Sequence, residues 1–446
     1  MPLHQPADGS ARSRTPRFRL LLAAATVWAA LTCCSAVRAQ GIFLTGTGPV
    51  NQSMGGASVA APLDSCGAIN WNPAAIGGLK CSDLEFGLGL VLPSESVSSS
   101  ALGVSGSTTG NPGVTPVPNM SFVNREGGCP WTWGIGIYGI GGFSSNYPAS
   151  ATFGSNINPI LTPQLPFGIG VGRVYADAEI YQVTPTVALE VADHFFVGLA
   201  PTLDLAKIEA DPLLLAPINF SIFDQYGPGD GTQYAMGGGF QAGMYYESDL
   251  GWNFGASYKS TQWFQPLRYN SNDSSGAPVY DKVAFELPSI VSLGTAFTGW
   301  ERFVLAADVR YIMYNDAEGF KGSGFEPNYA VVGLGWQNVW EVATGVQYCA
   351  TDRLKLRCGY TWVENPVPAA DTEFNIGTSL IMTNFASVGG SYMIRDGVMV
   401  NIAYTHGFRA TSTGPFVEPI VGPIPGTEIT TAVSADHLTM GLAVQF

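Results

Sequence analysis

Charged residues are scarce in this sequence. Only 12% of its 446 residues are Asp, Glu, Lys or Arg, which is about half the fraction usual in a soluble globular domain. Hydrophobic residues make up 46% of the chain, so much of the folded surface must face something other than water. The 20 basic residues are outnumbered by 34 acidic ones and form no basic stripe, which excludes a nucleic-acid-binding protein. The 12% of aromatic residues excludes an intrinsically disordered chain.

A long apolar run is also missing. The longest candidate, residues 20–31, is shorter than the ~20 residues that a transmembrane helix needs. It follows four arginines within residues 12–19 and precedes a small-x-small sequence that ends at Ala39, a combination typical of a secretory signal peptide. We therefore predict that residues 1–39 are a signal peptide, in preference to a membrane anchor or to cleavage as a lipoprotein.

Groups that could carry catalysis or bind a metal are scarce. The chain has four histidines and lacks the Gly-x-Ser-x-Gly turn that presents the nucleophile in many hydrolases. Five cysteines follow the predicted signal peptide: Cys66, Cys81, Cys129, Cys349 and Cys358. Their spacing matches no zinc site, and their odd number leaves at least one unpaired in an oxidising compartment, with Cys66 and Cys81 the pair to test. We predict neither an enzyme nor a bound metal or cofactor.

An exported, apolar chain without a spanning helix can cross a membrane as a closed β-barrel, in which the backbone groups of all strands pair with one another. Alternation supports this fold. Over residues 437–446 apolar side chains alternate with small or polar ones, which is typical of a strand between lipid and a lumen. The terminal residue, Phe446, resembles the signal that the outer-membrane barrel-assembly machinery recognises.

Fourteen segments of the chain read as strands, an even number as in bacterial single-chain barrels. Short turns with Gly or Asp alternate with long connectors, the pattern of periplasmic turns and extracellular loops. We predict an all-β, transmembrane antiparallel barrel over residues 83–446, surrounded by outer-membrane lipid and monomeric, in a Gram-negative bacterium. The predicted strands are 83–92, 118–124, 131–140, 178–191, 194–206, 234–247, 251–260, 283–298, 302–314, 337–349, 353–362, 384–395, 398–408 and 435–446.

Two of the long connectors are apolar. Within 148–170 and 211–226 the candidates for contact with a hydrophobic substrate are Phe153, Phe167, Leu213, Leu214, Phe220 and Phe223. Exposed apolar clusters usually mark a binding surface. The alternative is that these loops pack on one another and cap the barrel, and both can hold.

Residues 40–82 do not alternate and consist mostly of small, uncharged residues. They are too apolar for a disordered tail. A barrel of about fourteen strands is wider than its own side chains can fill, since about eight strands suffice for a filled interior. We therefore predict that this segment folds into the lumen as a plug.

This plug resembles the hatch of the FadL/TodX family of outer-membrane transporters for hydrophobic compounds. The resemblance rests on Ser53-Met54-Gly55-Gly56-Ala57, Asp64 and Asn72-Pro73-Ala74, and continues through Glu286-Leu287-Pro288, Asp308-Val309-Arg310-Tyr311 and Trp336-Gln337-Asn338-Val339-Trp340. It covers essentially the whole chain after the signal peptide. One departure is Ala75, which stands where the family's short motif usually has glycine.

The resemblance implies passive uptake, with the hatch residues just named acting in gating. Ligand would adsorb to apolar extracellular loops, enter a lumenal pocket and leave after a change in the hatch, sideways through an opening made by a kinked strand. Glycines that interrupt a strand suit such a kink, and the candidates here are Gly139, Gly141 and Gly142.

Long-chain fatty acids are the leading candidate for the substrate. Uptake of aromatic hydrocarbons and a structural or porin-like barrel without a hydrophobic ligand are the alternatives. Alternate residues of a strand face the same side, and this alternation predicts that three arginines face the lumen. These cations could bind a fatty-acid carboxylate there: Arg302, Arg310 and Arg357.

Overall fold

A computed structural model describes residues 41–446 except 219–224 and 273–276. The predicted signal peptide, residues 1–39, lies outside the described residues, as do Phe220 and Phe223. Among the residues described, no helix is both long and apolar enough to span a membrane.

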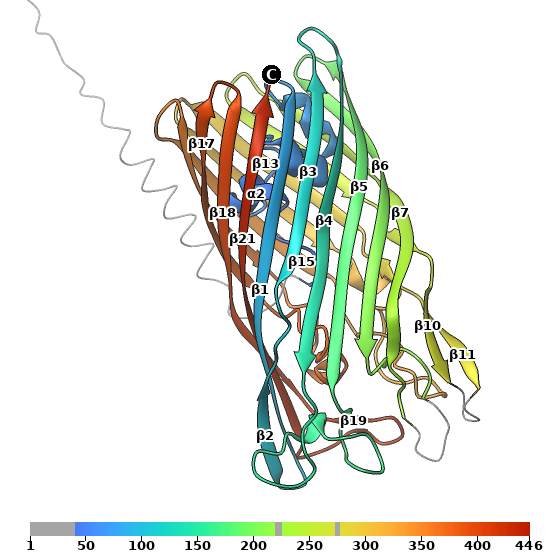
Figure 1. Cartoon of the computed structure of the whole chain (residues 1–446). Coiled ribbons are helices and arrows are strands. Elements are labelled where there is room, and N and C mark those ends of the chain that lie inside the picture. Colours follow the sequence, from blue (N-terminus) through green and yellow to red (C-terminus); the bar gives the residue numbers. More distant parts are fainter. Residues whose placement is uncertain (1–40, 219–224, 273–276) are drawn as a thin grey trace, which may run out of the picture. The chain divides into compact units, whose positions relative to one another are not determined.

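The described residues form a closed antiparallel barrel of fourteen strands (Figure 1). Each strand pairs with the next along the wall, and the last strand, β21, pairs with the first, β1, over eighteen residue pairs from Asp83–Gln445 to Ser100–Glu428. The wall strands are β1 (Asp83–Ala101), β3 (Thr115–Arg125), β4 (Trp131–Tyr147), β5 (Val174–Ala192), β6 (Phe195–Asp211), β7 (Gly229–Glu247), β8 (Trp252–Lys259), β13 (Ile290–Trp300), β14 (Phe303–Ile312), β15 (Val339–Cys349), β16 (Leu354–Val363), β17 (Asn384–Arg395), β18 (Val398–Gly414) and β21 (Glu428–Gln445). The predicted fold class is confirmed.

Several strands are longer than predicted at the end that carries the long loops. In β1 the outward-facing residues are leucines and one phenylalanine, Phe86, up to Leu92, and serines from Ser94 onward, although pairing with β21 continues to Ser100. The contrast between the two faces is lost where the outer face leaves lipid, so alternation could not mark the true end.

One predicted strand began too early. The segment 283–298 is not continuous, because short strands precede β13, which begins at Ile290.

The additional short strands are β2 (Val104–Thr109), β9 (Gln262–Phe264), β10 (Leu267–Asn272), β11 (Pro278–Val283), β12 (Glu286–Leu287), β19 (Val417–Glu418) and β20 (Gly422–Pro423). Most of them lie in or beside the long loops at the lower end in Figure 1, opposite the short turns and the C-terminus.

The outer wall is apolar and ends in aromatic side chains. Trp131, Trp133, Trp252 and Trp300 are each about half exposed at or near the short turns, the position of an aromatic girdle at a membrane interface. The inner wall carries mostly polar or small side chains, such as Thr132, Ser121 and Asn253, which are buried.

The side chains of the inner wall are buried because residues 41–79 fold inside the barrel. This segment contains α2 (Gly48–Ser53), α3 (Ser65–Trp71) and the 3₁₀ helix η1 (Pro73–Gly78). The helix α2 contacts β16–β18, β21 and β1, whereas α3 and η1 contact the wall from β1 to β7. The segment thus packs against much of the inner wall, in line with the predicted plug over residues 40–82.

Local sequence explains these short helices. Asp64 precedes α3 and its carboxylate accepts a hydrogen bond from Gly67 N at 3.1 Å, an N-cap. Asn72 ends α3 and begins η1, accepting a hydrogen bond from Ala74 N at 3.1 Å. Pro73 suits the first position of η1 because it has no N–H to satisfy.

The cysteine pair singled out from the sequence is not bonded. All five cysteines of the described chain are free thiols. Cys66 is fully buried in α3, whereas Cys81 is partly exposed where the chain leaves η1 for β1.

Candidate functional site

A buried ion network inside the barrel ties the segment 41–79, which we call the hatch, to the wall. Arg310 on β14 forms salt bridges with Asp308 at 2.9 Å and with Glu341 on β15, and all three side chains are excluded from solvent. The same guanidinium donates to the carbonyl of Gly56 at 2.6 Å and lies 3.5 Å from the ring centroid of Trp71. One arginine thus bridges two wall strands and two parts of the hatch.

Asp308 completes this anchor. Its Oδ2 accepts hydrogen bonds from the backbone N–H groups of Ser58 and Val59, at 2.7 and 3.0 Å. Thr361 on β16 donates to the carbonyl of Gly55 at 2.7 Å. Residues 55–59 of the hatch are therefore held by side chains of β14 and β16.

The hatch also lies very close to the wall in this region. Gly55 and Gly56 have φ values of 64° and 81°, a backbone conformation that favours glycine. A Cβ on Gly359 of β16 would overlap the backbone of Gly55. Met54 is fully buried in a cluster with Ala57 and wall alanines, and Ser53 donates to the carbonyl of Val50 at 2.8 Å.

The three arginines predicted to bind substrate are placed elsewhere. Arg310 and Arg357 do face the lumen, but at the depth that the hatch fills. Arg357 is buried and donates to Gln347 and Ser391, at 2.8 and 2.7 Å. Arg302 is exposed in the turn between β13 and β14. None of them lines the three cavities described below, so the prediction of a carboxylate site at these residues receives no support.

Asn72 holds the second half of the hatch in place. Its side-chain Nδ2 donates to the carbonyls of Val59 and of Met244 on β7, at 2.8 and 3.0 Å. A Cβ on Gly243 would collide with the Asn72 side chain. The asparagine therefore joins two hatch segments and the wall with one fully buried amide.

We expect Asn72→Ala to loosen the hatch without unfolding the barrel. The substitution removes three hydrogen bonds, and each buried group left unsatisfied costs about 1–3 kcal/mol. Uptake of a hydrophobic tracer by cells should fall, because hatch residues 41–45 line a lumenal cavity whose shape a loosened hatch would no longer hold. The barrel itself should keep its heat-modifiable mobility on gels. Asn315→Ala, at an exposed position of the 3₁₀ helix η3 (Tyr314–Asp316), is the matched control. Unchanged uptake in both variants would contradict a gating role for Asn72.

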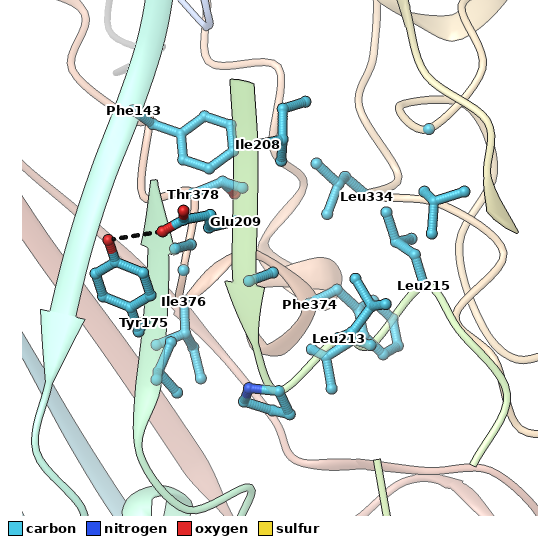
Figure 2. A pocket seen from close by; sticks show the side chains of 18 of the residues that line it. Phe143, Tyr175, Ile208, Glu209, Leu213, Leu215, Leu334, Phe374, Ile376 and Thr378 are labelled. Atoms are coloured by element: carbon cyan, nitrogen blue, oxygen red, sulfur yellow. Dashed lines mark hydrogen bonds between the residues drawn. The ribbon is translucent and has the colours of Figure 1, made fainter. Parts of the chain in front are cut away.

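An apolar cavity of about 910 Å³ lies among the long loops, and we call it the loop cavity. It is lined by the loop-side ends of β5 and β6, residues 212–215, strands β10 and β11, and residues 373–378. Figure 2 shows Leu213, Leu215, Leu334 and Phe374 around it, with Tyr175 donating a hydrogen bond to Glu209 at one side. Its apolar lining, with a few polar groups, is that of a small-molecule site.

Two further cavities continue from it. The wall cavity, of about 750 Å³, shares Phe143 and Thr378 with the loop cavity. The hatch cavity, of about 600 Å³, shares Gly142, Leu380 and Met382 with the wall cavity and is lined by hatch residues 41–45. The three cavities thus adjoin one another from the loops to the start of the hatch.

The wall cavity lies where the barrel wall is interrupted. Pairing between β3 and β4 stops at Asn119–Tyr138, although β3 pairs with β1 as far as Thr115. On its other side β4 shifts register between Gly139 and Gly141, a β-bulge.

The hatch takes over part of the pairing that β3 leaves. Leu44 N donates to the carbonyl of Ile140, and Gly142 N donates to the carbonyl of Ile42, both at 3.0 Å. The predicted kink glycines, Gly139, Gly141 and Gly142, all line the wall cavity. A Cβ on Gly139 would lie 2.9 Å from Val117 Cγ1 of β3. The absence of a side chain at Gly139 therefore leaves space between β3 and β4.

The charged side chains that line the three cavities are almost all acidic. Among the described residues, no Lys, Arg or His lines the loop cavity or the wall cavity, and the hatch cavity has one basic side chain, His437. Carboxylates do occur: Glu209 and Glu373 in the loop cavity, and Glu95 and Glu179 in the wall cavity.

The apolar loop residues divide into two groups. Leu213 and Leu214 line the loop cavity. Phe153 and Phe167 are 88% and 65% exposed and lie outside it. Sequence reasoning missed the contribution of residues 373–382, whose Phe374, Ile376 and Leu380 line the cavities, although the apolar run at 380–382 was a signal that could have marked this loop.

Comparison with known proteins places this architecture. A family model described as "Outer membrane protein transport protein (OMPP1/FadL/TodX)" matches residues 25–446. Among curated proteins, no sequence is significantly similar to this chain.

Solved structures share the fold at low sequence identity. The crystal structure of the toluene transporter TodX from Pseudomonas putida is 16% identical with a TM-score of 0.64, covering 90% of this chain and 99% of that one. The toluene transporter TbuX from Ralstonia pickettii is 17% identical with a TM-score of 0.63 and the same coverage. A Pseudomonas aeruginosa FadL homologue is 12% identical with a TM-score of 0.68, covering 91% of this chain and all of that one.

Proposed function

Because this chain belongs to the OMPP1/FadL/TodX family of outer-membrane transport proteins, we propose that its substrates are neutral hydrophobic molecules and not fatty-acid anions. The family places the protein in the outer membrane of a Gram-negative bacterium as a transporter of hydrophobic compounds. It is a channel-type transporter and not an enzyme, as the sequence predicted.

The observation that carries the choice of substrate is the charge of the loop and wall cavities. A carboxylate that leaves water for an apolar site needs a cation or strong hydrogen-bond donors to compensate for desolvation. These two cavities offer apolar side chains and four carboxylates, with no basic side chain in their described lining. A fatty-acid anion would be repelled there, whereas an alkane chain or an aromatic ring would be stabilised by burial.

The arrangement of the cavities suggests a route. A hydrophobic molecule adsorbs to exposed apolar loop residues such as Phe153 and Phe167 and moves into the loop cavity beside Leu213 and Leu214. It passes to the wall cavity and leaves between β3 and β4 at Gly139, into the membrane. The hatch, anchored by Arg310 and Asn72, closes the way to the periplasm.

Native mass spectrometry of the detergent-solubilised protein tests this choice of substrate. At pH 8 we expect butylbenzene to be retained and oleate to be lost at equal concentration. Leu213→Asp should weaken butylbenzene retention at least about tenfold, equivalent to ~1.4 kcal/mol, because it puts a charge into the loop cavity. Leu250→Asp is the control, since Leu250 is 81% exposed in a short turn.

Two outcomes would count against the proposal. Retention of oleate in preference to butylbenzene would restore fatty acids as the substrate. Retention of neither ligand by the folded barrel would favour a structural or porin-like protein.

A further inference from the structure

Glu373 is an unusual residue for an apolar cavity in a transporter of hydrophobic compounds. It begins the 3₁₀ helix η5 (Glu373–Asn375) in the long loop between β16 and β17. It lines the loop cavity beside Phe374 and Ile376. Glu373 is therefore one of the residues that a bound molecule would meet.

The carboxylate is fixed at one oxygen and available at the other. Glu373 Oε2 accepts a hydrogen bond from the backbone N–H of Val417, which begins β19. Within the part of the chain that the structure describes, Oε1 accepts no hydrogen bond. The backbone bond sets the position of the side chain, so the second oxygen is presented in a constant place.

The other polar groups around the cavity do not neutralise this oxygen. Glu209, which also lines the cavity, accepts a hydrogen bond from Tyr175 at 3.3 Å. Thr378 donates to Asn375 at 3.1 Å. No basic side chain lines the cavity among the described residues. An ionised carboxylate in such surroundings gains most from a ligand that brings its own hydrogen-bond donor.

We infer that the loop cavity prefers, among neutral hydrophobic molecules, those that carry a hydroxyl group, with Oε1 of Glu373 accepting the hydroxyl hydrogen. The apolar part of such a molecule would pack against Leu213, Leu215 and Phe374. The ligand class is thus alkylphenols and alcohols in preference to plain hydrocarbons or ethers. This inference rests on the proposed function, because it assumes that neutral molecules enter the cavity.

Three probes of similar size separate the inference from the proposed function. Butylbenzene has no polar group, 4-butylanisole can only accept a hydrogen bond, and 4-butylphenol can also donate one. The full chain would be studied by native mass spectrometry at pH 8, because burial raises the pKa of Glu373 to about 7 and the carboxylate must be ionised. We expect 4-butylphenol to bind about tenfold more tightly than 4-butylanisole, the effect of one hydrogen bond to a charged acceptor.

Glu373→Gln is the diagnostic variant. Glutamine keeps the shape of the side chain and its carbonyl oxygen can still accept from Val417 N, so η5 should stay in place. We expect the preference for the phenol over the anisole to fall to threefold or less, with butylbenzene retention unchanged. Glu326→Gln, at an exposed loop position outside the cavity, should behave as the wild type.

The possible results are distinguishable. If butylbenzene binds but the phenol shows no advantage over the anisole, the inference is wrong and the proposed function stands. A preference that persists in Glu373→Gln would also overturn the inference. If none of the three probes binds to the folded protein, the proposed function itself fails.

Discussion

Replacing Arg310 with methionine should destabilise the protein by about 3–5 kcal/mol, because it leaves two buried carboxylates without their cation. Asp308 and Glu341 both depend on this guanidinium, and neither is accessible to solvent. The substitution also removes the hydrogen bond to Gly56 and the contact with Trp71. We expect a lower melting temperature and a hatch that no longer seals the lumen, measured as increased ion conductance in planar bilayers.

Two controls for Arg310→Met test whether its effect comes from the unpaired buried carboxylates. Arg302→Met removes an exposed arginine from a turn and should change neither quantity. The triple variant Asp308→Asn, Arg310→Met, Glu341→Gln removes the charges together and should recover part of the melting temperature, since replacing a whole buried ion network is far less costly than breaking it. Unchanged stability in Arg310→Met would show that the network does not hold the hatch.

The barrel could be predicted from sequence because each wall strand must satisfy lipid on one side and a polar interior on the other. That requirement repeats every second residue and is visible locally, as over residues 437–446. Where the requirement ends, the signal ends too: β18 continues to Gly414, six residues past the predicted limit of 408, as a paired strand beyond the apolar band.

The lumenal arginines show what the alternation of side chains along a strand cannot predict. Alternation correctly assigned Arg310 and Arg357 to the inner face, but it carries no information about what else occupies the lumen at that depth. The partners of Arg310 include Gly56 and Trp71, which are more than two hundred residues away in the chain. Only the folded hatch shows that this arginine holds Gly56 and Trp71 in place.

The cavities are likewise a property of several loops together. The loop cavity is lined by Leu213, Leu334 and Phe374 together with the ends of strands. No single one of these loops has a sequence pattern that predicts a pocket. Apolar composition marked residues 211–226 as functional, yet the same composition at Phe153 gives an exposed side chain. Composition identifies loops that avoid water, whereas enclosure depends on which loops meet.

Closing the gap between β3 and β4 should stop transport while leaving binding intact. In Gly139→Phe the new ring would start 2.9 Å from Val117 Cγ1 and fill the wall cavity at its edge. A barrier higher by ~1.4 kcal/mol lowers a rate about tenfold, and we expect uptake of radiolabelled butylbenzene by cells to fall at least that much. Retention of butylbenzene in the loop cavity should persist, because that cavity is lined by other residues.

The control for Gly139→Phe is Gly127→Phe, in the short turn between β3 and β4, where an added Cβ would meet no atom within 4 Å. Both variants put phenylalanine in place of glycine beside the same two strands, so a general effect on assembly would appear in both. Loss of uptake in Gly139→Phe alone would support lateral release through the wall. Normal uptake in Gly139→Phe, with the protein folded and present in the outer membrane, would mean that the substrate passes the hatch, and a stronger dependence of uptake on Asn72 would then be expected.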